Sequence, residues 1–377
     1  MKNDVKFKDT VNFRNLKFDG SLSGVSSALD NGLSACVDWL AFTITELSSV
    51  QAVIEFLGFN IMQFSQAPRG AMGYKSMYKL DGHAVSVLYD GSEGMGIHVN
   101  ISGSAVAYCI SAYKSKISGP NPFDGKDTLQ VDDLSLTALS QFLKDLKQIG
   151  HITRLDLAID DKGDNQYFTC QQIQDYLQAD QVVSKFRKFH TDIDYKMGGE
   201  VIGHTIYLGS RKSEVFLRIY DKMLEQRAKD PDAASIPWVR WELELKNNRA
   251  NAVADLLISG SSMGSIILGV LSNYMRIVNL DDSNRSRCSS IGKWKAFCMG
   301  VSRIRLYVPD MPKTLEDKRQ WIDKQVLSTL AGLFLAYGGT FCFIEDNIDI
   351  GIKKMKYDLR ELVLKANPDA IEFFQEI

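Results

Sequence analysis

The sequence has few cysteines and histidines, and neither residue type is grouped as a metal site. The six cysteines are scattered with no Cys-x-x-Cys pair, and the five histidines are isolated with no His-x-His pair. Without such a cluster, a zinc site has no ligands, and reduced thiols in a cytoplasm are favoured over a disulfide framework. Any metal site must therefore be built chiefly from carboxylates.

Long apolar runs, an ATP-binding loop and an excess of charge are also absent. The longest apolar runs, near Ile266–Leu271 and Leu330–Tyr337, are too short to span a bilayer. No signal peptide opens the chain, so we expect a cytoplasmic protein, and no phosphate-binding loop indicates an ATP-driven motor. The net charge of −2 over 377 residues excludes a chain that coats nucleic acid by charge alone. A DNA-binding protein of this composition must concentrate its cations locally.

What the sequence does contain is a strand pattern that carries a tyrosine. Across Arg211–Lys222, apolar residues alternate with larger polar ones in the two-residue period of a half-buried strand. Tyr220 then shares the polar face with two cations, Arg218 and Lys222. Nearby positive charge favours the phenolate and makes Tyr220 a candidate nucleophile. The alternative is an ordinary strand whose tyrosine hydroxyl makes a surface hydrogen bond.

Two further strand patterns, at 151–160 and 238–246, each place two carboxylates and an arginine on one face. Clustered like charges are costly unless a cation lies among them, and oxygen ligands suit Mg²⁺ or Mn²⁺. The alternative is a pair of solvated faces with arginine–carboxylate pairs between strands. The candidate metal ligands are Asp156, Asp160, Glu242 and Glu244.

These segments together resemble the Rep_trans family of rolling-circle replication initiators. The resemblance rests on ITRLDLAID, TIYLGSRKS, FLRIYDK and WVRWELELK, in this order between about Cys36 and Asn248. The layout is most similar to the replication proteins of filamentous vibriophages, and the group includes plasmid initiators of Gram-positive bacteria. Where relatives often carry a carboxylate, this chain has Asn100, which puts a metal role at that position in doubt.

The resemblance implies that Tyr220 attacks origin DNA, forming a 5′-phosphotyrosyl link and freeing a 3′-hydroxyl that primes a host polymerase, with a host helicase as a further partner. We therefore expect a metal-dependent nickase and strand transferase that later rejoins the strand in a bacterial cell. Two alternatives stay open: a relaxase for conjugative transfer, and a non-catalytic DNA-binding protein on the same scaffold. Whether the protein forms a homodimer is also left open.

The order of helical and strand patterns predicts an α+β fold. We expect a largely antiparallel sheet with helices on one face and a polar catalytic face, plus a smaller helix-rich C-terminal domain. The predicted divisions are an irregular arm over 1–34, a catalytic domain over 35–249, and a DNA-recognition or assembly domain over 250–377. A single long helix is predicted from Thr314 to about Tyr337, opened by a capping box of Thr314 and Asp317.

One stretch, Ser283–Pro309, holds six cations and no acidic residue, with aromatic residues between them. This composition predicts a phosphate-tracking surface with stacking aromatics. The alternatives are a basic loop packed on its own domain, and recognition by a smaller basic-aromatic patch at Lys185–Phe189. The candidate DNA contacts are Arg211, Lys212, Arg285, Arg287, Lys293, Trp294, Lys295, Arg303 and Arg305.

Overall fold

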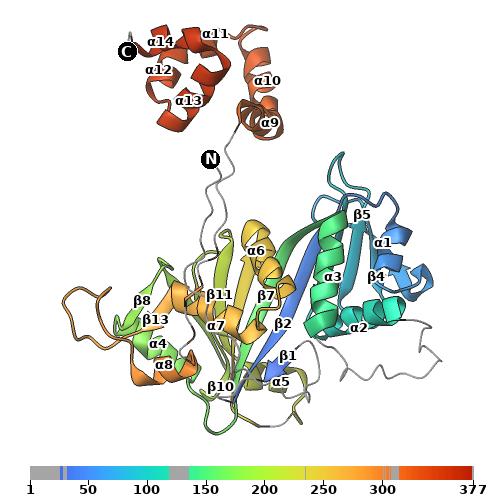
Figure 1. The fold of residues 1–377 in the computed structure, drawn as a ribbon, viewed down its shortest axis with the longest axis vertical. Coiled ribbons are helices and arrows are strands. Elements are labelled where there is room, and N and C mark those ends of the chain that lie inside the picture. The colour runs from blue at the N-terminus through green and yellow to red at the C-terminus, as the bar shows by residue number, and fades with distance from the viewer. Residues whose placement is uncertain are drawn as a thin grey trace. The chain divides into compact units, whose positions relative to one another are not determined.

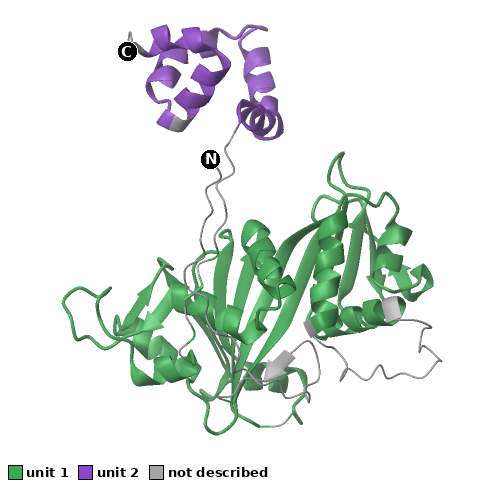
Figure 2. Ribbon diagram, in the orientation of Figure 1, with its two compact units in different colours: residues 1–308 green, residues 309–377 purple. Residues whose placement is uncertain are grey.

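A computed structural model describes residues 26–28, 32–118, 136–233, 235–299, 301, 303, 304, 306 and 314–375. The chain divides into two compact units, Met1–Val308 and Pro309–Ile377 (Figure 2). The first unit extends past the boundary predicted at residue 250, because it includes α6 (Asn247–Ile258) and α7 (Met263–Tyr274). Their apolar residues pack in the same core as the sheet.

One antiparallel sheet organises the first unit, and among the described residues it contains eleven strands. The strands lie in the order β3 (Phe64–Gln66), β4 (Ser76–Leu80), β5 (Val85–Tyr89), β6 (Ile97–Ser102), β2 (Leu33–Ile44), β7 (Gly150–Lys162), β12 (Trp238–Lys246), β11 (Val215–Asp221), β10 (Val201–Leu208) and β9 (Phe189–Tyr195), and β1 (Ser26–Ala28) pairs with β2. A small separate sheet joins β8 (Val182–Ser184) to β13 (Met275–Ile277). The predicted antiparallel architecture is confirmed.

Helices cover one face of this sheet and leave the other face polar. In Figure 1, α3 (Leu136–Ile149), α6 and α7 lie across the central strands. The same core takes in residues from α1 (Val50–Phe56), α2 (Ser104–Ser118), α4 (Cys170–Gln178) and α8 (Gly292–Phe297). One helix, α5 (Lys222–Lys229), instead continues directly from β11.

Strand alternation decides which side chains reach which face. On β7, Leu155, Leu157 and Ile159 are fully buried in the core beneath the helices. Asp156 and Asp160 alternate with them and therefore point to the opposite face. A tight turn at Asp81-Gly82 joins β4 to β5, and Gly82 has a φ of +74°, which suits glycine.

The second unit is a small group of helices. It contains α9 (Leu315–Gln325), α10 (Leu327–Ala336), α11 (Cys342–Glu345), α12 (Ile348–Lys353), α13 (Tyr357–Ala366), a 3₁₀ turn (Pro368–Ala370) and α14 (Ile371–Gln375). The capping box of Thr314 and Asp317 is confirmed, but the single helix predicted from Thr314 is wrong. The helix breaks at Val326, whose φ of −121° departs from helical geometry. No helix in the described parts of either unit is long and apolar enough to cross a membrane.

Candidate active site

Tyr220 lies at the end of β11, where the strand passes into α5. It is opposite Arg240 on β12, and Arg240 is in turn opposite Asp160 on β7. The next residue, Asp221, caps α5 by accepting a 2.9 Å hydrogen bond from the backbone N–H of Leu224. The Tyr-Asp-Lys order therefore encodes the end of a strand, a helix cap and the first helical residue, which together fix the position of the phenol.

Arg240 is the cation that connects this row of side chains. Its Nε and Nη2 donate to the two carboxylate oxygens of Asp160 at 2.6 and 2.8 Å, and its Nη1 donates to Asp38 at 2.5 Å. Trp238 Nε1 also donates to Asp160, at 2.8 Å. Asp160 is thus held by three donors, and its oxygens are less available to a metal ion than the sequence suggested.

Asp38 is a member of the site that the sequence analysis did not select. The register between β2 and β7 shifts between Val37 and Trp39, and this bulge turns Asp38 onto the polar face, where it meets Arg240. A carboxylate in an otherwise apolar central strand was the available signal. Arg240, which was also not selected, could have been found from its place beside Glu242 in the polar alternation of β12.

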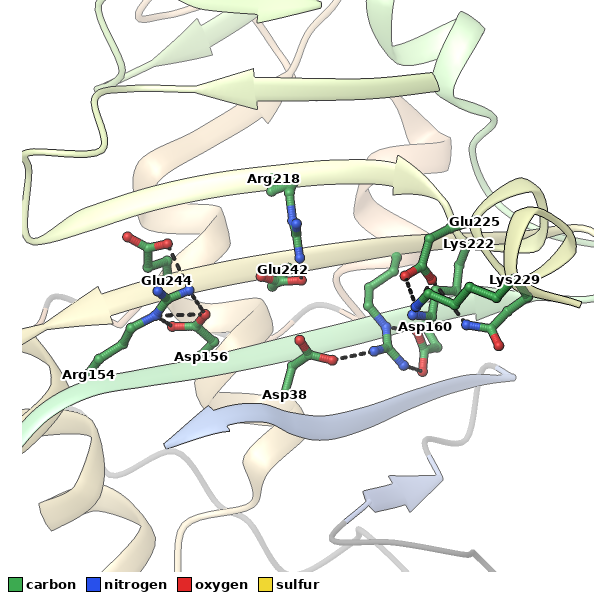
Figure 3. Close-up of polar contacts among 12 residues, drawn as sticks. Asp38, Arg154, Asp156, Asp160, Arg218, Lys222, Glu225, Lys229, Glu242 and Glu244 are labelled. Carbon is green, nitrogen blue, oxygen red and sulfur yellow. Dashed lines mark hydrogen bonds and ion pairs between the residues drawn. The ribbon is translucent and has the colours of Figure 1, made fainter. Parts of the chain in front are cut away.

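Figure 3 shows the side chains of Asp38 and Glu242 near each other on the polar face, and Glu242 is opposite Ala158 of β7 in the register. Glu242 is buried and accepts a hydrogen bond from Arg218, its partner in the register. Burial raises the pKa of Glu242, Arg218 opposes that rise, and the negative charge of Asp38 adds to it. This part of the face thus holds more negative charge than its arginines compensate.

We define the central cluster as Asp38, Asp160, Arg218, Tyr220, Arg240 and Glu242. It contains one more carboxylate than guanidinium. Lys222, the other predicted neighbour of Tyr220, does not correct this balance, because it forms an ion pair with Glu225 of α5.

Asp156 and Glu244 belong to a different group, the lateral cluster, which we define as Arg154, Asp156, Glu244 and Lys246. Arg154 donates to both oxygens of Asp156 and lies 3.0 Å from Glu244, and Lys246 lies 2.6 Å from Glu244. Arg154 also stacks over Trp39, with its guanidinium carbon 4.2 Å from the ring centroid. Burial raises the pKa of Asp156 to about 7 although Arg154 opposes the shift. Carboxylates and cations are equal in number here.

The predicted metal ligands are therefore not brought together as one set. Within the described ranges, no three His, Cys, Asp or Glu side chains are arranged to hold a metal ion. Asp38 and Glu242 nevertheless fit a hard cation, because Mg²⁺ is usually bound by one or two carboxylates together with substrate phosphate and water. The uncompensated carboxylate of the central cluster supports this pair rather than Asp156 and Glu244.

The phenol of Tyr220 is more buried than the sequence pattern suggested, at 6% exposed. Burial raises its pKa well above the ordinary value for tyrosine, and Arg240 is the main cation that opposes this rise. Arg218 lies over the ring, with its guanidinium carbon 4.7 Å from the centroid. We expected Arg218 and Lys222 to lower the pKa of Tyr220, but in the folded chain by itself this pKa is raised.

The prediction that Trp294 of the basic stretch Ser283–Pro309 stacks on DNA is wrong. Trp294, in α8, is only 3% exposed and packs against Phe168, Trp241 and Phe297 in the core. A ring in this position cannot stack on a base. The alternation of cations and aromatic residues here belongs to the short helix α8, whose apolar side packs in the core against β12.

The cations of the same stretch divide into engaged and exposed residues. Arg285 forms an ion pair with Asp180 and donates to the backbone oxygen of Val182, and Lys293 donates to Gln172 at 3.2 Å. Lys293 is exposed despite this contact, as are Arg287, Lys295 and Arg303, and the turn between β10 and β11 adds exposed Arg211 and Lys212. Arg305 lies outside the described residues.

Comparisons with known proteins identify the family and the fold. The family model Rep_trans, described as replication initiation factor, matches residues 150–341, just over half of the chain. The chain therefore belongs to the Rep_trans family of replication initiation factors. It is 26% identical over 314 residues to the candidate DNA relaxase NicK of Bacillus subtilis (strain 168), covering 81% of this chain and 82% of that protein.

A solved structure gives the same fold. The rolling-circle replication initiator protein of Geobacillus stearothermophilus matches with a TM-score of 0.58 and 28% identity, over 74% of this chain and all of that one. The α+β architecture predicted from the sequence is thereby confirmed.

Proposed function

We propose that the protein starts rolling-circle replication by cutting one strand of origin DNA, with Tyr220 as the nucleophile. The observation that carries the proposal is the placement of Tyr220 on the polar face of the sheet, beside two guanidiniums, in a cluster that holds one more carboxylate than guanidinium. The relatives support it, since one is named a rolling-circle initiator and the other a candidate relaxase.

The reaction is a phosphoryl transfer to a phenol. The Tyr220 oxygen attacks the phosphorus, the bond between phosphorus and the 3′ oxygen breaks, and the 5′ phosphate remains on the tyrosine. The phenol proton is released to water, and the leaving 3′ oxygen takes up a proton from water to become the free 3′-hydroxyl. Because burial raises the pKa of Tyr220, positive charge is needed to favour the phenolate. Arg218 and Arg240 supply part of this charge and stabilise the negative charge that develops on the phosphate.

A divalent cation, Mg²⁺ or Mn²⁺, would supply further positive charge at a non-bridging phosphate oxygen. Asp38 and Glu242 are the residues we propose to hold it, with Asp160 kept as the partner of Arg240. Arg240 then has two tasks, since it neutralises Asp160 and orients Asp38 toward the site. Lys222 holds Glu225 at the start of α5 and supports the strand end that carries Tyr220.

The covalent link also explains how the strand is resealed. The phosphotyrosyl bond conserves the energy of the phosphodiester, so attack by a 3′-hydroxyl reverses the reaction without ATP. In replication, a host polymerase extends the free 3′ end while a host helicase separates the strands. A role as a relaxase in conjugative transfer is the second candidate, favoured by the similarity to NicK over most of both chains.

Covalent capture tests the proposal. Supercoiled plasmid carrying the origin of the replicon that encodes the protein is incubated with protein and Mg²⁺, and the product is denatured. We expect the 5′ end of the cut strand to migrate with protein and the 3′ end to be free. Tyr220→Phe should yield neither nick nor link, whereas Tyr207→Phe, on the same face, should yield both. Cutting by the Tyr220→Phe protein would show that another residue is the nucleophile.

A further inference from the structure

Four side chains on the polar face form a stacked group next to the central cluster. The rings of His190 and Tyr207 lie 6.1 Å apart at 15°, and those of Tyr207 and Phe216 lie 5.9 Å apart at 19°. The guanidinium carbon of Arg211 lies 5.3 Å from the Tyr207 ring and 5.5 Å from the Phe216 ring. We call His190, Tyr207, Arg211 and Phe216 the stacking platform.

The register of the sheet places this platform beside the nucleophile. Tyr207 on β10 is opposite Arg218 on β11, and Thr205, two residues earlier, is opposite Tyr220. One strand spacing across and two residues along amount to about 8 Å. This separation is within reach of the first bases that flank a scissile phosphate held at Tyr220.

Folding alone does not explain an aromatic group at this position. The core beneath this part of the sheet is made by the opposite face of the same strands, through Ile206, Leu208 and Leu217. On the polar face, His190 is a surface residue, with 71% of its side chain exposed, Tyr207 is half-buried, and Phe216 is buried against them. Aromatic rings that remain accessible on a polar face can stack on the face of any base.

The charges around the platform suit a phosphate backbone. Arg211 and Lys212 are exposed in the turn that follows β10. Beside the same turn is a pocket of about 620 Å³, which is lined by Lys185, Arg187 and Lys188. Three nearby carboxylates have partners: Asp192 lies 2.6 Å from His190, Glu214 lies 3.7 Å from Arg249, and Glu244, which is opposite Phe216 in the register, lies 2.6 Å from Lys246.

We propose that the stacking platform binds an unpaired base of single-stranded DNA that flanks the cut phosphate. Tyr207 and His190 stack on the base, and Arg211 contacts both the rings and the adjacent phosphate. This inference rests on the proposed function for its substrate, but it assigns a binding role to residues that take no part in the chemistry. Since stacking does not depend on base identity, the platform holds the strand in place without reading its sequence.

The test compares two probes with the same charge, the 12-mer dA12 and a 12-residue abasic strand, bound to full-length protein in EDTA and measured by fluorescence anisotropy. All proteins carry Tyr220→Phe, so no strand is cut and the result does not depend on the nucleophile assignment. We expect Tyr207→Ala to reduce the preference for dA12 by about tenfold. Tyr207→Phe keeps the ring and should keep the preference.

Two further variants make the result decisive. His190→Ala changes an exposed residue, so it reports on stacking even if Tyr207→Ala folds poorly, and it should reduce the preference severalfold. Tyr195→Ala removes an exposed tyrosine from the far end of the same strand and should leave the preference unchanged. An unchanged preference in both Tyr207→Ala and His190→Ala would overturn the platform, as would an equal loss in Tyr195→Ala.

Discussion

The central and lateral clusters come from the same pattern of alternating charges on β7 and β12, yet their charges are balanced differently. In the lateral cluster, Arg154 and Lys246 neutralise Asp156 and Glu244. In the central cluster, two arginines face three carboxylates. The balanced lateral cluster fits a structural role, whereas the excess carboxylate beside Tyr220 fits the proposed binding of a cation and a phosphate.

The largest expected difference between the clusters is in nicking rate. Glu242→Gln removes one of the two carboxylates that fit a cation, so we expect the rate on supercoiled origin DNA to fall about 10²- to 10³-fold. Glu244→Gln is a matched change two residues away on the same strand, and it should change the rate only a few fold. Rates are measured under single-turnover conditions with saturating Mg²⁺. Equal losses would mean that the two clusters act as one site.

The reverse contrast should appear in stability. Arg154→Ala leaves Asp156, which is 0% exposed, without its partner, and such a loss costs about 3 kcal/mol. The double change Arg154→Met with Asp156→Leu should recover most of this free energy of unfolding, because well-packed apolar residues can replace a buried pair. Urea unfolding followed by circular dichroism measures both. If the single variant is as stable as the wild type, the lateral cluster has no structural role.

Metal binding offers a comparison that does not depend on activity. A cation bound only by the folded protein raises its stability, by about 2.7 kcal/mol at a hundred times the dissociation constant. We expect Mg²⁺ or Mn²⁺ to raise the melting temperature of the wild type, and Asp38→Asn or Glu242→Gln to abolish that rise. Asp156→Asn should retain it. In parallel, EDTA should stop nicking. If only Asp156→Asn loses the rise in melting temperature, the metal is bound in the lateral cluster instead.

The sequence predicted the two faces of the sheet because alternation along a strand depends on local order alone. Asp156, Asp160, Glu242 and Glu244 all lie on the polar face, as predicted. Their division into two clusters depends on register, which brings Asp38 to Arg240 over more than 200 positions of sequence. A bulge that turns one side chain leaves no periodic signal, so Asp38 was missed.

Burial explains two further errors. Trp294 looked like a stacking aromatic because cations surround it in sequence, but its helix turns the ring into the core under Trp241. The acidity predicted for Tyr220 counted neighbouring charges and omitted desolvation, which dominates once the residue is enclosed. In both cases the cations are present as the sequence indicates, but the surrounding fold determines whether the aromatic side chain is exposed.

The smallest expected effects concern duplex binding, where the same contrast between engaged and exposed cations applies. Arg287 and Lys295 are exposed, so Arg287→Ala with Lys295→Ala should flatten the salt dependence of origin duplex binding by about two units of slope, one for each phosphate contact. Nicking of a single-stranded oligonucleotide should be nearly unchanged, because the central cluster is intact.

Arg285→Ala is the informative partner of that double variant. Arg285 pairs with Asp180 and donates to the backbone oxygen of Val182, the first residue of β8, so its loss should lower stability and leave the salt slope nearly unchanged. Anisotropy titrations at several salt concentrations, beside thermal unfolding of each variant, separate the two effects. If Arg285→Ala changes the slope as much as the exposed pair does, then an ion pair within the fold does not mark a structural cation. The contrast between engaged and exposed charges would then lose its value for locating DNA contacts, and recognition of the duplex would have to be sought in the turn that carries Arg211 and Lys212.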